Sequence, residues 1–157
     1  LEFRRVLFRS ITTMSSIHEV LERKGRTVLT TQRQASVLEA IGSMSQANIG
    51  AIVIEQDGRP VGIFTERDYL RKIALEGRSS RETKVDEVMS SPLITVTPAD
   101  STQTAMETMT ERRCRHLIVV DGEELVGIVS LGDLVKHMLV EKQAEVDQLS
   151  SYIAGSY

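Results

Sequence analysis

Residues 62–68 read Gly-Ile-Phe-Thr-Glu-Arg-Asp, and residues 127–133, which lie 65 positions later, read Gly-Ile-Val-Ser-Leu-Gly-Asp. The same offset aligns the surrounding sequence without a gap and pairs, for example, Ser36 with Ser101. An internal repeat at a fixed spacing indicates two copies of one structural unit. The two copies together occupy residues 27–139.

Each copy predicts the element order β-α-β-β-α. The first strand is expected at residues 27–30 in the first copy and at 93–96 in the second. In the first copy a helix begins after the N-cap Ser36, and two apolar runs flank the turn Asp57-Gly58, which is typical of a hairpin. Such a small unit leaves one sheet face uncovered. The sequence therefore predicts an α/β fold of tandem repeats, packed sheet to sheet about a pseudo-twofold axis.

The repeat also suggests domain boundaries. Residues 14–82 are expected to form the first copy with a helix in front of it, residues 83–139 the second copy, and residues 140–157 a C-terminal helix and tail. Residues 1–13 contain three arginines, which favours a non-native extension and leaves a basic targeting segment as the alternative. The apolar stripe of the last helix is either a dimer contact or a surface that packs on its own repeat.

The composition argues against several classes of protein. Lys and Arg number 19 against 22 Asp and Glu, and the resulting net charge of −3 disfavours general binding to nucleic acid or to an anionic membrane. The single cysteine, Cys114, excludes an intrachain disulfide. No apolar run approaches the roughly 18 residues of a membrane span. We therefore expect a cytoplasmic protein with neither nucleic acid nor membrane as a partner.

The repeated motif, Gly-x-x-Thr/Ser-x-x-Asp, joins the end of a strand to the start of a helix. Thr65 and Ser130 stand at helix N-caps, where a hydroxyl and free backbone amides favour an anion. Asp68 and Asp133 follow one helical turn later, where a carboxylate can accept two hydrogen bonds from a vicinal diol such as that of a ribose. A single copy is more typical of an ordinary capping box. Two copies at equivalent places favour a site for a polar ligand.

With these motifs, and with Arg115-His116 leading into the apolar run 117–120, the sequence resembles the CBS-domain pair, or Bateman module, of the small stand-alone type. The resemblance covers residues 16–152. It implies a cleft between the repeats that binds an adenosine-containing ligand such as AMP, ADP, ATP, S-adenosylmethionine or NAD.

The resemblance implies a role for each matching residue. The two aspartates of the motif would bind the ribose, and Arg115 and His116 would meet the phosphate. At the equivalent positions the first repeat has the uncharged Gly50 and Ala51, so its site would borrow a cation or take a less phosphorylated ligand. The candidate cations are Arg67, Arg71 and Lys84. The complete set implied for the nucleotide is Leu29, Ile49, Gly50, Ala51, Ile94 and Cys114 around the adenine, with Thr65, Arg67, Asp68, Arg115, His116, Ser130, Gly132 and Asp133 around the rest of the ligand.

Other polar residues give weaker signals. His18, His116 and His137 are far apart in the sequence and show no spaced carboxylate partner, so no metal site is expected. Cys114 lies between Arg113 and Arg115, and it is either a small hydrophobe near the adenine or a redox-active thiol with a lowered pKa.

The function expected from the resemblance is that of a non-catalytic sensor. A homodimer would bind an adenine nucleotide, and occupancy would change its conformation or its affinity for a regulated enzyme. The alternative is a module that has lost its ligand and only dimerises. A nucleotide hydrolase is disfavoured because the sequence has no Walker-type loop and no clustered carboxylates for a metal.

Overall fold

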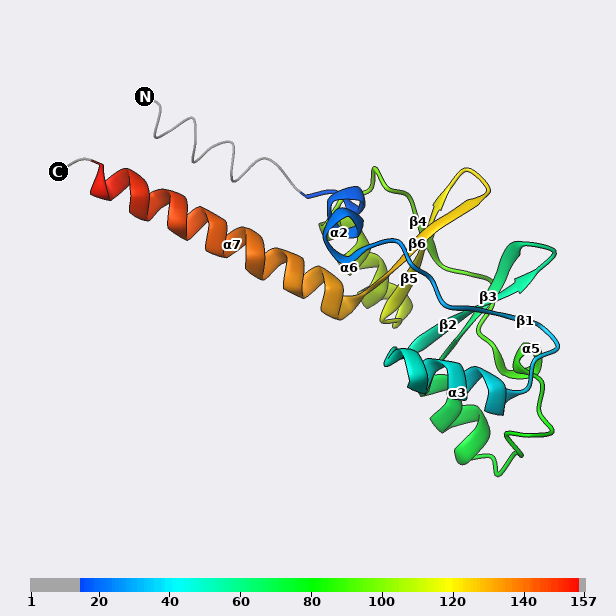
Figure 1. The fold of residues 1–157 in the computed structure, drawn as a ribbon. Coiled ribbons are helices and arrows are strands. Elements are labelled where there is room, and N and C mark those ends of the chain that lie inside the picture. The colour runs from blue at the N-terminus through cyan, green and yellow to red at the C-terminus, as the bar shows by residue number, and fades with distance from the viewer. Residues whose placement is uncertain (1–14, 156–157) are drawn as a thin grey trace. The chain divides into compact units, whose positions relative to one another are not determined.

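The computed structural model describes residues 15–155, and Figure 1 shows their helices and strands. In chain order these are α2 Ile17–Lys24, β1 Thr30–Gln32, α3 Val37–Ala47, β2 Ala51–Gln56, β3 Arg59–Thr65, α4 Glu66–Asp68, the π-helix η1 Tyr69–Ala74, α5 Val85–Val88, β4 Thr95–Val96, α6 Thr102–Arg112, β5 His116–Asp121, β6 Glu124–Ser130 and α7 Leu131–Ala154. The predicted α/β class and the tandem repeat are both confirmed by this order.

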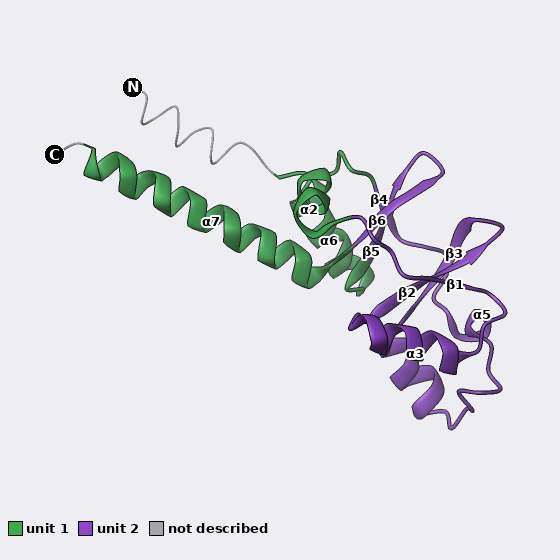
Figure 2. Ribbon diagram, in the orientation of Figure 1, with its two compact units in different colours: residues 1–25, 97–116, 129–157 green, residues 26–96, 117–128 purple. Residues whose placement is uncertain are grey.

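The chain divides into two compact units, which Figure 2 distinguishes by colour. Among the described residues, one unit comprises residues 15–25, 97–116 and 129–155, and the other comprises residues 26–96 and 117–128. Because these units cut across the two repeats, the boundaries predicted after residues 82 and 139 stay a proposal.

The unit that contains the first repeat is built on a sheet of strand order β1-β2-β3. Strand β1 runs parallel to β2, with Thr30 opposite Val53, and β2 runs antiparallel to β3, with Ala51 opposite Thr65. The apolar run of β2 is buried, as its lack of polar alternation predicts. Helix α3 begins at a capping box between Ser36 and Glu39 and packs one apolar face on the strands. The core consists of Val37, Ala40, Met44, Ile52, Ile54, Phe64, Ile73, Val85 and Val88.

The second repeat forms a sheet of strand order β4-β5-β6. Equivalent hydrogen bonds link the first strand to the second in both repeats. The amide of Val53 donates to the carbonyl of Leu29 at 2.9 Å, and that of Ile118 donates to the carbonyl of Ile94 at 3.2 Å. These pairs are related by the offset of 65 positions, so the sequence repeat is also a repeat of backbone pairing.

Two elements differ from the sequence-based expectation. The first strand of each repeat starts two to three residues later than predicted, at Thr30 and Thr95. The helix expected from Glu66 is a short α4 that continues as the π-helix η1, whose C-cap residue Leu75 donates its amide to the carbonyl of Leu70. The wider turn places Ile73 in the core, where it is 1% exposed.

The unit that contains the C-terminus is helical, and it includes α2, α6 and α7. Helix α2 buries Ile17, Val20 and Leu21 and contacts α7, and the amide of Ile17 donates to the carbonyl of Asp100 at 2.8 Å. The C-cap residue of α6 is Arg113, with φ of 53°, and the C-cap residue of α3 is the equivalent Asn48, with φ of 54°.

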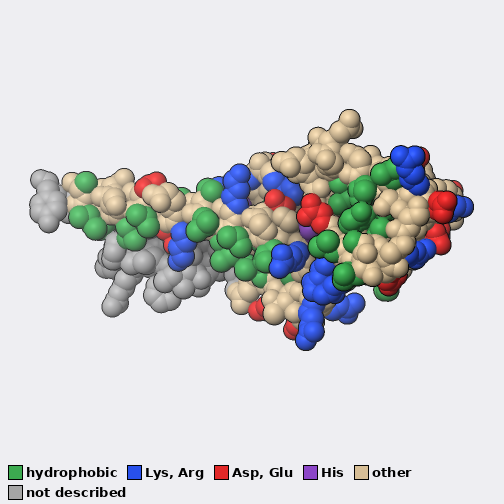
Figure 3. Space-filling model, turned by 90° about the horizontal axis from the view of Figure 1, so that it is seen from below, with side chains coloured by type: hydrophobic (Ala, Val, Ile, Leu, Met, Phe, Trp, Pro, Cys, Tyr) green, Lys and Arg blue, Asp and Glu red, His purple; other side chains and the backbone are tan. Residues whose placement is uncertain are grey.

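Helix α7 is one continuous helix of 24 residues, which confirms the predicted long final helix. Of its side chains only Leu134 and His137 are buried. Apolar side chains follow it into the part that extends beyond the other helices of its unit (Figure 3), and those exposed are Leu131, Val135, Met138, Leu139, Val140, Val146, Tyr152 and Ile153. Within residues 15–155, these side chains of α7 are therefore exposed.

Candidate functional site

The second copy of the motif lies where β6 ends and α7 begins. Asp133 accepts a hydrogen bond from the Ser130 amide at 2.8 Å through Oδ2, and its own amide donates to Ser130 Oγ at 3.1 Å. This reciprocal pair is a capping box, and the positive end of the helix dipole lies next to the carboxylate. The predicted N-cap role of Ser130 is confirmed.

Lys24, the last residue of α2, also contacts Asp133. Its Nζ lies 2.6 Å from Oδ2, and the two side chains are 28% and 26% exposed. Partial burial raises the pKa of the Asp133 carboxyl, but the hydrogen bonds from Lys24 and Ser130 and the lysine charge outweigh it and hold that pKa below its usual value. Both contacts use Oδ2, so within residues 15–155 Oδ1 is left for a further donor.

The lowered pKa of Asp133 predicts a pH-dependent contribution to stability. This contribution is present above the unfolded-state pKa of about 4 and is lost as the pH falls through the lower folded-state pKa. Replacing Asp133 by asparagine is expected to cost about 0.5–1 kcal/mol near pH 6, and the difference from the wild type should shrink below about pH 4. Urea unfolding at a series of pH values measures it. A difference that stays constant down to pH 3 would contradict the assignment.

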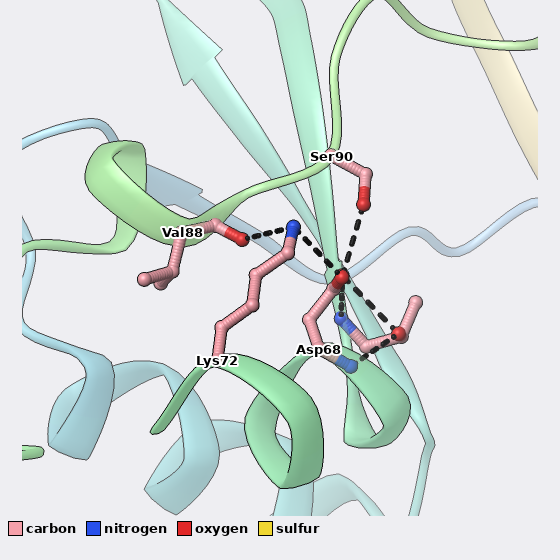
Figure 4. Close-up of polar contacts among 5 residues, drawn as sticks. Asp68, Lys72, Val88 and Ser90 are labelled. Carbon is pink, nitrogen blue, oxygen red and sulfur yellow. Dashed lines mark hydrogen bonds and ion pairs between the residues drawn. The ribbon is translucent and has the colours of Figure 1, made fainter. Parts of the chain in front are cut away.

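The first copy of the motif holds its aspartate more tightly (Figure 4). Asp68 Oδ2 accepts from the Thr65 amide at 3.1 Å and from Thr65 Oγ1 at 3.2 Å, while Oδ1 accepts from Ser90 Oγ at 3.0 Å and lies 3.1 Å from Lys72 Nζ. Lys72 is itself anchored, because its Nζ donates to the Val88 carbonyl at 2.9 Å. The Asp68 side chain is only 12% exposed. Here the capping box is embedded in a structural network.

The two repeats thus differ in how much of the carboxylate is left for a ligand. Both oxygens of Asp68 are occupied by side chains of the protein, whereas Asp133 uses only Oδ2. A diol could reach Asp133 without breaking a contact, but at Asp68 it must compete with Ser90 and Lys72. The asymmetry predicted from Gly50 and Ala51 therefore extends to the aspartates.

In the first repeat the structure brings several predicted residues together at one end of the sheet. Ala51 is paired with Thr65, and the carbonyl of Gly50 accepts from the Glu66 amide at 3.1 Å. A Cβ atom at Gly50 would lie 3.4 Å from Glu66 Oε2, in ordinary contact with that side chain. Leu29 lies one strand away and Ile49 is 40% exposed.

In the second repeat the carbonyl of Arg115 accepts from the Leu131 amide at 2.9 Å. This bond is the equivalent of the one between Gly50 and Glu66, and it places Arg115, Cys114, Ser130, Gly132 and Asp133 in one compact unit. His116 is the first residue of β5. The predicted Ile94 belongs to the other unit, where it bonds to the amide of Ile118.

Sequence reasoning missed the two lysines and the serine that contact the aspartates. It named Arg67, Arg71 and Lys84 as cations for the first repeat, but the cation beside Asp68 is Lys72. Lys84 instead donates to Gln34 Oε1 at 2.8 Å. The spacing of four residues between Asp68 and Lys72 could have indicated this pair. Neither Lys24 nor Ser90 is close to its aspartate in the sequence, so no local signal marks them.

The structure also changes the interpretation of Cys114 and His137. Burial raises the pKa of the Cys114 thiol, and backbone hydrogen bonds and the charge of Arg112 lower it by less. The alternative of a redox thiol with a lowered pKa is therefore wrong, and the interpretation of Cys114 as a small hydrophobic side chain remains. His137 does have carboxylate partners, since Glu141 follows it by one turn and Glu19 faces it from α2.

None of the helices within residues 15–155 has the length and apolar character that a membrane span requires.

Comparison with known proteins gives a consistent assignment. The sequence profile of the CBS domain matches residues 13–75 and 85–140. The chain is 40% identical over 152 residues to the CBS domain-containing protein CBSX3, mitochondrial, of Arabidopsis thaliana, a match that covers 91% of this chain and 74% of the relative.

Solved structures agree with the sequence matches. A protein with CBS domains from Burkholderia ambifaria is 41% identical, with a TM-score of 0.78, over 80% of this chain and 95% of that one. The CBS domain protein PAE2072 from Pyrobaculum aerophilum, solved in complex with AMP, is 28% identical, with a TM-score of 0.68, over 76% of this chain and 89% of that one.

Proposed function

This chain belongs to the CBS domain family, and on that premise we propose that it is a non-catalytic regulatory module that binds an adenine nucleotide of the AMP, ADP, ATP or NAD class. The AMP bound to the relative from Pyrobaculum aerophilum supports the ligand class. The chain keeps both aspartates and both hydroxyls of the repeated motif, which favours binding over a module that only dimerises.

The observation that carries the proposal is the environment of Asp133. Its carboxylate lies in the first turn of a 24-residue helix, is 26% exposed, and has one oxygen that makes none of its contacts with Ser130 and Lys24. A carboxylate in this state can accept hydrogen bonds from ribose hydroxyls, each worth about 1.5–3 kcal/mol when the acceptor is charged.

The remaining residues of the proposed site follow their sequence equivalence. Arg115 and His116 would neutralise phosphate in the second repeat. In the first repeat Arg67 stays a candidate, and Lys72 joins it as the cation that already contacts Asp68. The adenine would lie against apolar and small residues. The proposed contacts of the base are Leu29, Ile49, Gly50 and Ala51 in one repeat and Ile94 and Cys114 in the other, with Thr65, Ser130 and Gly132 beside the two aspartates.

Ligand binding would act on the protein through Lys24. This residue joins the end of α2 to the start of α7 by its contact with Asp133. A ribose that bonds to Asp133 and a phosphate that attracts Lys24 would both change this contact. Because a ligand shifts an equilibrium only by its different affinity for two states, the packing of α2 on α7 is the property that we expect occupancy to alter.

A second copy of this chain is the proposed partner. The exposed apolar stripe of α7 fits a homodimer contact, and the dimer's conformation would pass occupancy to a regulated enzyme. The cytoplasmic location stays a prediction, and the Arabidopsis relative is named as a mitochondrial protein.

Titration of the full chain with AMP tests the proposed function. At an AMP concentration about 100-fold above Kd, binding stabilises the native state by about 2.7 kcal/mol, which raises the melting temperature by roughly 5–10 °C. We expect a saturable heat in calorimetry and a shift of this size in a thermal scan. If millimolar AMP, ADP, ATP and NAD all leave the melting temperature unchanged, the alternative function is correct, namely an interaction module that binds no nucleotide.

A further inference from the structure

His137, in the second turn of α7, is buried without satisfying its polar atoms. The side chain is 3% exposed, and neither Nδ1 nor Nε2 has a hydrogen-bond partner among residues 15–155. Buried polar atoms without a partner are rare in native proteins and destabilise them. A buried imidazole whose two nitrogens make no hydrogen bond therefore requires an explanation, and the nucleotide site does not supply one.

Two carboxylates face this imidazole from two helices. Glu141, one turn further along α7, has Oε1 at 3.2 Å from His137 Nε2, and Glu19 of α2 has Oε2 at 4.0 Å from the same nitrogen. One ligand atom of each residue lies within 4.8 Å of the other two. The hydroxyl of Ser15, which is 4% exposed, donates to Glu141 Oε1. Helices α2 and α7 contact each other within one compact unit, so these distances belong to a single packed region.

We infer that Glu19, His137 and Glu141 form a binding site for a divalent transition-metal ion of the zinc class. Ligand atoms that bind zinc at 2.0–2.2 Å in a tetrahedron are about 3.4 Å apart. The separation of 3.2 Å between His137 and Glu141 already matches this spacing. The separation of 4.0 Å to Glu19 requires a shift of about half an ångström, which its 56% exposed side chain can make.

The donor set favours zinc over the hard cations. Imidazole nitrogen is a good ligand for zinc, copper, iron and nickel, whereas magnesium and calcium select oxygen ligands and larger coordination shells. One histidine and two carboxylates supply three protein ligands, and a water molecule would complete the tetrahedron. The ion would satisfy Nε2 and neutralise the two glutamates. Since Nδ1 has no hydrogen-bond partner among the described residues, we expect a zinc affinity about 10–100-fold weaker than that of sites whose histidines are oriented by a second hydrogen bond.

Bound metal would connect α2 to α7 at a second point. Lys24 and Asp133 already join the end of α2 to the start of α7, and the metal would join the beginning of α2 to the next turns of α7. The site would therefore make the stability of this helix pair depend on zinc as well as on the nucleotide.

Titration of the full chain, freed of metal by a chelator, with zinc chloride is the direct test. We expect one ion per chain by calorimetry, and cobalt chloride should give the visible absorption of a four-coordinate site. Glu19→Gln and Glu141→Gln should each weaken zinc binding at least tenfold, because each removes a charged ligand. Both positions are at least 38% exposed, so these variants are expected to fold.

Matched variants separate this site from adventitious binding at the surface. Glu22→Gln lies on α2 and Glu145→Gln on α7, outside the cluster, and we expect each to bind zinc within twofold of the wild type. His18→Gln removes the exposed pair of His18 and Glu22, and it should also leave the affinity unchanged. The inference is wrong if no stoichiometric zinc binds, or if His18→Gln abolishes binding while Glu19→Gln and Glu141→Gln preserve it. AMP titration of Glu19→Gln, expected to match the wild type, keeps this outcome distinct from a failure of the nucleotide proposal.

Discussion

Replacing Gly62 by valine is expected to destabilise the protein by about 2–3 kcal/mol and to lower its melting temperature by roughly 5–10 °C. A Cβ atom at this position would lie 2.4 Å from Met89 Sδ, 2.9 Å from its Cγ and 3.2 Å from the Ser90 carbonyl oxygen. The Ser90 backbone cannot easily retreat, because it exchanges two hydrogen bonds with Ile63, of 3.1 and 2.8 Å. The glycine of the first motif therefore serves the close approach of residues 89–90 to β3.

The glycine in the middle of α3 provides the control. Gly42 has no atom within 4 Å of an added Cβ, so Gly42→Ala should stabilise the protein by about 0.5–1 kcal/mol through the lower backbone entropy of alanine. Urea unfolding should show a lower free energy of unfolding for Gly62→Val and a higher one for Gly42→Ala. A Gly62→Val protein as stable as the wild type would show that residues 89–90 do not press on β3 as described.

The Gly62→Val substitution should also weaken the contacts of Asp68. Ser90, whose backbone a valine would displace, donates its hydroxyl to Asp68 Oδ1. Movement of this segment would leave one oxygen of a nearly buried carboxylate with Lys72 alone. In the first repeat, the glycine of the motif thus allows residues 89–90 to approach β3, and Ser90 in this segment then holds the aspartate of the motif.

The fold was predictable because the repeat specifies it twice. The offset that aligns Gly62 with Gly127 also relates the backbone bonds of Leu29 and Ile94, and it places Asn48 and Arg113 at equivalent helix ends. The strand starts were less predictable, since Thr30 and Thr95 depend on pairing with β2 and β5, which are distant in the sequence. The π-helix after Asp68 also has no local signal, because packing of Ile73 in the core competes with helical propensity.

The candidate site was predictable only in its local part. Capping boxes lie within four residues, so Thr65 with Asp68 and Ser130 with Asp133 could be placed from the motif alone. The cations could not, because Lys24 reaches Asp133 across 109 positions of the chain. The cluster around His137 contains one local and one distant contact. The spacing of four residues between His137 and Glu141 is a helical signal that the sequence analysis did not use, whereas Glu19 comes from another helix and has no local signal.

Replacing Asp133 by asparagine is expected to weaken AMP binding at least tenfold, which corresponds to one lost charge-assisted hydrogen bond of about 1.5 kcal/mol. Asparagine keeps the size of the side chain and one carbonyl oxygen, which can still accept from the Ser130 amide. It replaces the second oxygen by an NH₂ group, which cannot accept from a ribose hydroxyl. Calorimetric titration with AMP measures the change, and the circular dichroism spectrum should match that of the wild type.

Asp68→Asn is the matched variant in the first repeat, and it should separate the two carboxylates. Both oxygens of Asp68 are already used by Thr65, Ser90 and Lys72. We therefore expect Asp68→Asn to reduce stability more than Asp133→Asn does. The affinity of the tighter of the two AMP sites should stay within about threefold of the wild type. Equal loss of AMP affinity in the two variants would mean that both carboxylates serve one ligand. Unchanged affinity in Asp133→Asn would instead remove the ribose assignment, because no other described carboxylate at a repeated motif has an oxygen left to accept the diol.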